Sequence, residues 1–198
     1  MKEENNLKMV FSWFSSSEPS EPAPETERGG YECAPYTILE THPHYEVRSY
    51  PERKWATVVF EKMGANIGHN DMPMTRNWRE QPQNKSFMKL FRYISGNNES
   101  GAKISMTVPV STKVTQEGEM IREEMGFYVP SDHQEEAPAP GDKSAEVRIV
   151  TRPDMVAFVR KFGGYAKDED WSRERENLIK DLKTRPDAGD IDFDVYFR

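Results

Sequence analysis

Apolar and polar residues alternate over most of the chain, which predicts a protein rich in β-strands. β-Branched and aromatic residues alternate in part with polar ones at residues 35–40, 45–50 and 55–60. The same pattern predicts further strands at residues 103–114, 120–129, 146–150, 155–162 and 191–197. Pro109 favours an edge or a bulge, because proline cannot donate a ladder hydrogen bond. We expect turns at Pro51 and Pro153 to fold their flanking strands into two hairpins.

Two segments show helical spacing instead. In residues 85–95 the apolar positions recur at i, i+3, i+4 and i+7, which is one face of a helix. These positions are Phe87, Leu90, Phe91 and Ile94. Gly96 and Asn97 are typical residues at the end of a helix. Residues 168–184 form a second, highly charged helix whose apolar face carries Trp171, Leu178 and Leu182. The strands and helices together predict an α+β fold.

The N-terminal part of the chain differs in composition. Residues 15–30 are rich in serine, proline and glutamate, so they cannot bury enough apolar surface to offset their ordering entropy. We therefore predict a disordered tail over residues 1–30 and one folded domain over residues 31–198. No apolar run approaches the roughly 20 residues that a membrane-spanning helix needs, so we expect no integral membrane segment. Residues 63–84 show no period and predict a long loop.

Charge and cysteine content narrow the classes of partner. The formal net charge is -7, and an acidic chain is repelled by phosphate backbones, so we expect no nucleic-acid partner. With Cys33 as the single cysteine, the chain can form neither an internal disulfide nor a cysteine zinc cluster. A cytoplasmic location agrees with this.

Catalytic patterns are absent from the sequence. There is no GxSxG elbow, and paired acids such as Glu123 and Glu124 lie among polar residues, as solvated charges do. We expect a protein that is not an enzyme. His42 and His44 are weak candidates for metal ligands, because the pattern His-Pro-His is more typical of exposed loop histidines.

The 85–95 helix carries the most informative chemistry. Lys85, Lys89 and Arg92 give it three positive charges and no negative one, within an acidic chain. Its apolar residues are Phe87, Met88, Leu90 and Phe91. Apolar surface beside cations suits a flat apolar ligand with carboxylates. An ordinary amphipathic helix with a solvated basic face would show the same pattern.

An internal echo indicates a duplicated unit. Glu46-Val47-Arg48 recurs as Glu146-Val147-Arg148, and residues 55–58 match residues 156–159 one position out of step. Each echo is followed by a predicted helix and then a strand.

Four blocks of the sequence resemble the SOUL/haem-binding-protein family. They are Tyr45–Tyr50 (YEVRSY), Lys103–Val110 (KISMTVPV), Phe127–Pro130 (FYVP) and Phe162–Ala166 (FGGYA). The four blocks occur in family order at similar spacing, and the resemblance covers about residues 35–198. It implies a distorted antiparallel β-barrel flanked by two helices and built from a duplicated unit.

The resemblance also implies a function and a site. Family members bind haem and related porphyrins in a shallow apolar groove beside the first helix, which makes haem the expected ligand and a cytosolic buffer or carrier the expected role. The expected haem-binding residues are Phe87, Met88, Lys89, Leu90, Phe91 and Arg92. Lys89 or Arg92 would lie near the haem propionates.

Two departures from the family qualify this expectation. Some members have a histidine, proposed as an iron ligand, where this chain has Ser49, and serine is a poor haem ligand. Members usually continue beyond the position of Arg198, so the resemblance implies that a C-terminal barrel strand is missing. Two alternatives stay open: a general pocket for flat apolar molecules, and a protein-interaction module acting through the 168–184 helix.

Overall fold

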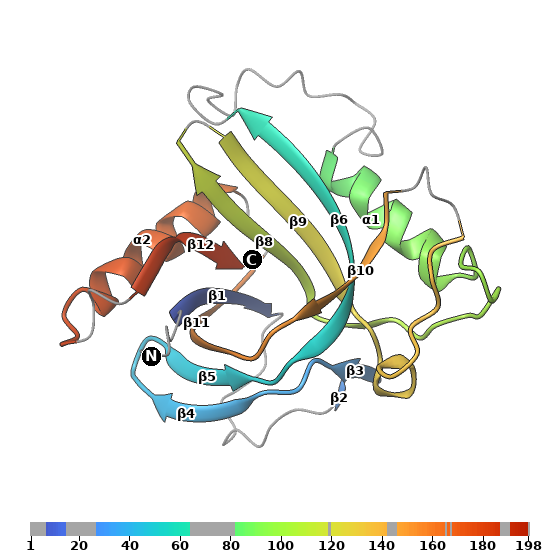
Figure 1. Cartoon of the computed structure of the whole chain (residues 1–198). Coiled ribbons are helices and arrows are strands. Elements are labelled where there is room, and N and C mark those ends of the chain that lie inside the picture. Colours follow the sequence, from blue (N-terminus) through green and yellow to red (C-terminus); the bar gives the residue numbers. More distant parts are fainter. Residues whose placement is uncertain are drawn as a thin grey trace, which may run out of the picture. The chain divides into compact units, whose positions relative to one another are not determined.

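The structure is a computed structural model in which two compact units are described separately (Figure 1). It describes residues 7–14, 27–63, 82–118, 120–141, 146–164, 166, 168–186 and 191–197. Unit 1 consists of Met1–Thr26, Pro35–Glu52 and Pro153–Arg198, and unit 2 of Glu27–Ala34 and Arg53–Arg152. The long loop expected at residues 63–84 falls mostly outside the described residues, between β6 and α1.

Unit 2 is built on four antiparallel strands and one helix. The strands are β6 (Arg53–Met63), β8 (Val110–Glu117), β9 (Met120–Tyr128) and β10 (Arg148–Arg152), in the order β10-β6-β9-β8. Helix α1 (Pro82–Ile94) packs on β6 and β9. A small second sheet joins β2 (Glu27–Arg28), β3 (Tyr31–Cys33) and β7 (Thr107–Val108), and the short 3-10 helix η2 (Ser131–His133) follows β9.

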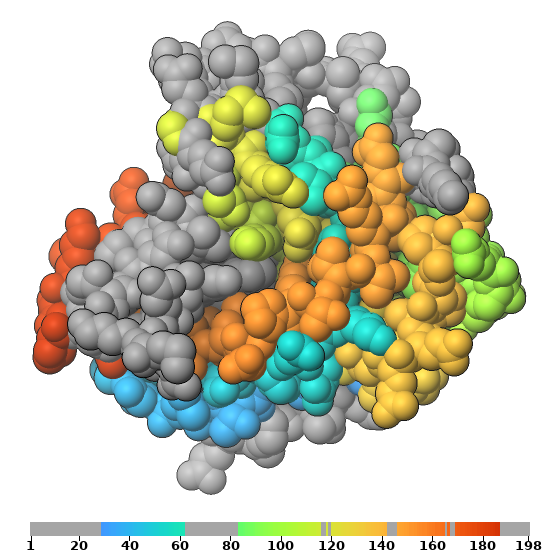
Figure 2. Space-filling view, viewed as in Figure 1, coloured from blue at the N-terminus to red at the C-terminus, as the bar shows by residue number. Residues whose placement is uncertain are grey.

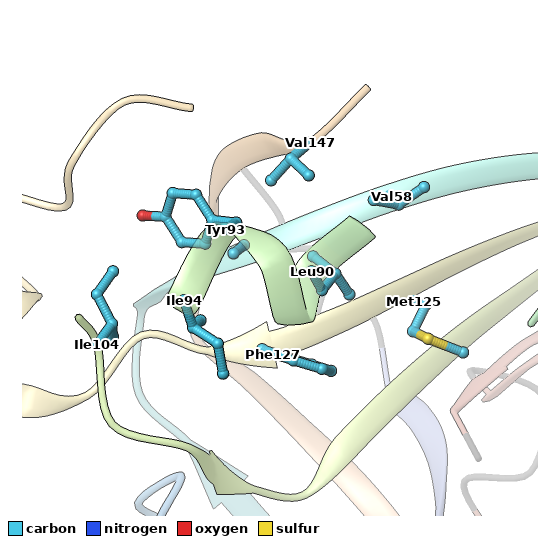
Figure 3. Packing of buried hydrophobic residues seen from close by; sticks show 9 residues of the cluster. Val58, Leu90, Tyr93, Ile94, Ile104, Met125, Phe127 and Val147 are labelled. Carbon is cyan, nitrogen blue, oxygen red and sulfur yellow. The ribbon is translucent and has the colours of Figure 1, made fainter. Parts of the chain in front are cut away.

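The core of unit 2 lies between α1 and the sheet (Figure 3). Alternation along β6 turns Ala56 and Val58 toward the helix, and β9 contributes Met125 and Phe127 to the same face. The remaining buried members of this cluster are Leu90, Tyr93, Ile94, Ile104 and Val147. The opposite face of the sheet buries a smaller group, Trp55 and Tyr128 with Ala34 and the half-buried Val150.

The loop after β9 is tied to the C-terminal end of α1. Figure 2 shows the gold atoms of this loop beside the yellow-green atoms of the segment that follows the helix. The Tyr93 hydroxyl donates to the carbonyl of Pro138 at 2.8 Å. Burial raises the pKa of Tyr93 to about 12 from its ordinary value of 10.0. The pKa of Tyr93 is higher in the folded protein than in the unfolded chain. The stability that the protonated Tyr93 hydroxyl contributes is therefore complete below about pH 10 and is lost as the pH rises toward 12.

We therefore expect Tyr93→Phe to remove part of the alkaline sensitivity of the fold. The variant should lose about 1 kcal/mol of unfolding free energy at neutral pH, because the hydrogen bond to Pro138 is gone. Urea titrations at about pH 8 and about pH 11 should show a smaller loss of stability with pH for the variant than for the wild type. Equal losses in both proteins would contradict the prediction.

The described residues of unit 1 form five strands and the second α-helix. The strands are β1 (Leu7–Phe14), β4 (Thr37–Thr41), β5 (Glu46–Tyr50), β11 (Met155–Gly163) and β12 (Ile191–Phe197), in the order β12-β1-β11-β5-β4. β5 pairs antiparallel with β4 and β11, whereas β1 is parallel to both β11 and β12. Helix α2 (Asp168–Leu182) buries Leu178 and Leu182 against Val47 and Phe158.

The predicted α+β class and most element positions are confirmed. The largest shift of a boundary concerns the strand expected at residues 103–114. Strand structure begins only at Thr107, and Pro109 separates β7 from β8, since proline interrupts a ladder. Helix α1 begins at Pro82, three residues before the predicted start. The closed barrel implied by the family resemblance stays a prediction.

The expected hairpins at Pro51 and Pro153 are wrong. β5 pairs with β4 and β11, and β6 pairs with β9 and β10, so the strands on either side of Pro51 take different partners. The same holds for β10 and β11 on either side of Pro153. A two-residue hairpin turn needs positive φ at its first central position, which the proline ring forbids.

The disordered tail expected at residues 1–30 stays a prediction as a whole, although within it Leu7–Phe14 forms β1 between β11 and β12. Averaging over a polar tail hides this short apolar stretch, and its ladder partners come from strands far along the chain. Residues 27–30 are also ordered in β2 and the turn that follows it, and residues 15–26 lie outside the described residues.

The two units share one strand-pairing register. In unit 1, Arg48 pairs with Ala157, and in unit 2, Arg148 pairs with Thr57. Arg148 lies one hundred positions after Arg48, and Thr57 lies one hundred positions before Ala157, so the two ladders pair equivalent positions. This is the offset of the Glu-Val-Arg echo in the sequence.

Candidate functional site

Helix α1, which carries the predicted site residues, is bounded by ordinary helix signals. Pro82 occupies its first position, where the missing N–H costs nothing. At its end, Gly96 adopts φ +111°, a conformation that favours glycine. The amide of Gly96 donates to the carbonyl of Tyr93 and that of Asn97 to the carbonyl of Arg92, which is a Schellman cap. The helix is therefore fixed at its C-terminal end, next to Phe91 and Arg92.

The apolar face predicted for α1 divides into a buried and an exposed part. Leu90 is fully buried in the core, so the structure lends no support to its assignment as a haem-binding residue, which stays a prediction. Phe87 is half-buried and packs edge-on against Phe127, with ring centroids 5.3 Å apart. Phe91 is 44% exposed and stacks on Phe87 at 6.2 Å, with 11° between the ring planes. The two parallel rings thus extend the core onto the surface.

The other predicted residues, Met88, Lys89 and Arg92, differ in their exposure and in their position around the helix relative to this aromatic pair. Met88 is half-buried and Arg92 is exposed. At about 100° per residue, Met88 lies about 60° from Phe91 around the helix and Arg92 about 100°. Lys89 lies further around, next to Lys85 and Arg92 on the same basic stripe, and its Nζ lies 3.0 Å from Glu146 Oε2. Arg92, with the exposed Lys85 nearly two turns earlier on the same side, is therefore the cation nearest to the aromatic pair.

The two candidate metal-binding histidines belong to unit 1, where His42 makes a ring contact and a hydrogen bond within the unit. His42 stacks on Tyr45 with ring centroids 4.4 Å apart, and its Nε2 lies 2.8 Å from Glu40 Oε2. Arg185 also contacts Glu40, at 3.1 Å. His44 has an exposed side chain. Within the described residues, no group of three or more histidine, cysteine, aspartate or glutamate side chains could hold a metal ion.

The pKa of Glu40 reflects this arrangement. Hydrogen bonds from Arg185 and His42 hold it below the ordinary carboxyl value. Ser49, at the position where some family members have a histidine, is a half-buried residue of β5 opposite Val156.

The face of α2 that was expected to bind a protein partner is occupied by unit 1 itself. Leu178 and Leu182 are fully buried against β5 and β11. Trp171 packs edge-on against Phe162 at 4.8 Å. This face fills the core of its own unit and is not free to dock into another protein's groove, which weakens this alternative. No helix in the described part of the chain is long and apolar enough to cross a membrane.

Sequence reasoning missed an arginine in unit 2 that is largely buried, with its side chain 11% exposed. Arg152 lies 4.2 Å above the Trp55 ring, donates to Ser111 Oγ at 2.7 Å and pairs with Glu124 at 3.0 Å. Gly126 leaves room for this guanidinium, since a Cβ there would lie 2.8 Å from Arg152 Nη2. Burial lowers the pKa of Arg152, and Glu124 opposes that shift. In the sequence, Arg152 precedes Pro153 and is indistinguishable from an exposed turn residue.

Unit 1 holds a second buried arginine. Arg48 pairs with Glu46 at 2.7 Å, and its guanidinium lies 4.0 Å from the centre of the Tyr36 ring. Lys161 also pairs with Glu46, at 2.8 Å. Desolvation would raise the pKa of Glu46, but Lys161 and Arg48 outweigh it and hold the pKa below its ordinary value. We assign both buried arginines a structural role.

Comparison with known proteins finds a family that matches nearly the whole chain. The family model described as SOUL heme-binding protein matches residues 31–197. Mouse heme-binding protein 1 is 30% identical over 172 residues, which are 85% of this chain and 83% of that protein. Human heme-binding protein 2 is 31% identical over 156 residues, covering 77% of this chain and 67% of that protein. This chain therefore belongs to the SOUL heme-binding protein family.

Proposed function

We propose that this protein binds haem and related tetrapyrroles on the exposed aromatic side of α1, without catalysis, as a cytosolic buffer or carrier. The observation that carries the proposal is the stacked pair of Phe87 and Phe91, with Phe91 44% exposed beside Arg92. Relatives named heme-binding protein 1 and 2 support it. The shallow groove implied by the resemblance stays part of the proposal.

The chemistry of the ligand fits these side chains. A tetrapyrrole is a flat apolar ring with acidic substituents on one edge. Phe91 and Met88 offer apolar contact to the ring, and Arg92 and Lys85 offer cations to the carboxylates. Apolar burial contributes roughly 25 cal/mol per Å², or several kcal/mol for one ring face, whereas an exposed charge pair adds about 1 kcal/mol or less. The apolar contact therefore dominates the proposed affinity.

In this proposal, iron coordination contributes less to the affinity for haem than apolar contact with the ring does. Nε2 of His42 is engaged by Glu40, and the family's proposed ligand position holds Ser49. If the ring supplies the affinity, iron-free protoporphyrin IX should bind nearly as well as haem. Binding that needs the iron, and is abolished by His42→Ala, would contradict the proposal.

We expect Phe91→Ala to weaken haem binding about tenfold, because it removes the exposed ring of the aromatic pair. Titration followed in the Soret region measures the affinity, and a thermal melt checks the fold. Leu39→Ala is the matched control, since Leu39 is a 53% exposed apolar residue on β4 of unit 1. Equal affinities of Phe91→Ala and the wild type would exclude this surface as the haem site.

A general binder of flat apolar molecules is the second candidate. Stacked phenyl rings do not by themselves require a macrocycle, and this observation favours the broader specificity. Competition separates the two functions. Other porphyrins should displace haem and unrelated planar dyes should not; displacement by both would support the general binder.

We also propose that the two units are copies of one duplicated unit. The shared register of Arg48 with Ala157 and of Arg148 with Thr57 supports it, as does the single α-helix among the described residues of each unit. The resemblance implies that such copies close into a distorted antiparallel barrel.

A further inference from the structure

Glu146 places a carboxylate against a helix that has none of its own. Helix α1 contains no acidic residue between Pro82 and Ile94. Glu146 precedes β10 and lies far from α1 in sequence, yet its Oε2 is 3.0 Å from Lys89 Nζ. This ion pair engages one of the helix's three cations.

The backbone around Glu146 presents this carboxylate in an unusual way. Among the described residues, Glu146 is the one non-glycine with positive φ, at +59°, a conformation that residues with a Cβ disfavour. Its neighbour Val147 is buried in the cluster with Leu90 and Tyr93 (Figure 3). The buried Val147 fixes the chain beside α1, and the left-handed turn at Glu146 accompanies the contact with Lys89. Sparsely populated backbone conformations often accompany functional contacts.

The corresponding residue of unit 1 behaves differently. Glu46, one hundred positions earlier, extends along β5 and pairs with Arg48 and Lys161 of the sheet. Its side chain is 15% exposed, whereas that of Glu146 is 65% exposed. Only in unit 2 does the equivalent carboxylate reach a helix. The contact with Lys89 is thus specific to the helix proposed to bind the ligand.

We propose that Glu146 is a built-in competitor for ligand carboxylates at α1. By occupying Lys89, it leaves Arg92 and Lys85 as the cations available to the ligand and limits the affinity for flat ligands that carry carboxylates. Uncharged flat ligands are unaffected, so Glu146 sets the selectivity between the two classes. This inference rests on the proposed function of α1.

The test compares a dicarboxylic porphyrin with its uncharged ester. Glu146→Gln should raise the affinity for protoporphyrin IX about two- to fivefold, the range that an exposed charge pair supplies. It should leave the affinity for protoporphyrin IX dimethyl ester unchanged. The gain should shrink in high salt, which screens exposed charges. Glu136→Gln, in an exposed glutamate of the loop between β9 and β10, is the control for net charge and should produce no gain.

A double variant tests whether Glu146 acts through Lys89. With Lys89→Gln also present, Glu146→Gln should give no gain and the protein should bind as the wild type does. An unchanged affinity of the single variant, or a gain that persists without Lys89, would overturn the inference. Failure of the proposed function is distinguishable, because Phe91→Ala would then leave the binding of both porphyrins unchanged.

Discussion

Leu90→Ala will lower the free energy of unfolding by about 2–5 kcal/mol, the range for deleting a large buried side chain. Leu90 is fully buried between α1 and the sheet, in one cluster with Tyr93 and Phe127. Truncation removes the transfer free energy of its methyl groups and leaves a cavity that neighbouring strands cannot fill without moving. Urea unfolding followed by circular dichroism measures the loss.

The adjacent residue provides the control. Phe91→Ala should change the unfolding free energy by less than about 1 kcal/mol, because Phe91 is largely outside the core. Conversely, Leu90→Ala should bind haem with wild-type affinity wherever it is folded. If Leu90→Ala weakened haem binding in the folded protein while leaving stability intact, the division of α1 into a buried and a ligand-binding side would be refuted.

Arg152→Ala will destabilise the protein by up to about 3 kcal/mol, between the cost of losing an exposed ion pair and that of breaking a fully buried one, because the Arg152 and Glu124 side chains are 11% and 20% exposed. The variant loses the stacking on Trp55 and the hydrogen bond to Ser111. It also leaves the Glu124 carboxylate, whose side chain is only 20% exposed, without this cation. Arg152→Lys should recover little of the loss, because an ammonium group can neither stack as a plane nor donate in a fork.

Chemical denaturation of matched variants checks this expectation. Arg122→Ala is the control, since Arg122 makes an exposed 3.9 Å pair with Glu61 and should cost less than about 1 kcal/mol. Adding Glu124→Gln to Arg152→Ala should restore part of the stability by removing the poorly solvated charge. Similar losses for Arg152→Ala and Arg122→Ala would show that burial adds nothing to the Arg152 contacts.

Local pattern was sufficient to predict most elements, because alternation and helical spacing are properties of neighbouring residues. Strand pairing was not predictable in this way, since it joins segments that are distant in sequence. Pro51 shows the difference: its neighbours were recognised as strands, but the hairpin between them was wrong. β1 shows it again, because Leu7–Phe14 gains its hydrogen bonds from strands near the other end of the chain.

The sequence predicts the helix that carries the candidate site, but it does not show which residues of that helix lie at the surface. Spacing places Leu90 and Phe91 on the same apolar face, and only the packing of the sheet shows that the first is buried and the second exposed. Glu146 escaped prediction altogether. Its role depends on a left-handed backbone and on a contact with Lys89, and neither leaves a mark in the local sequence.

The position of β1 determines an order of events during synthesis. Its two neighbours, β11 and β12, come from the last quarter of the 198-residue chain. All four strands of the main unit 2 sheet come from Arg53–Arg152 and can pair while the ribosome is still translating the remainder. The apolar stretch LKMVFSWF is synthesised well before either of its ladder partners, β11 and β12. A nascent chain of this protein therefore carries this apolar strand unpaired until β11 and β12 have been synthesised.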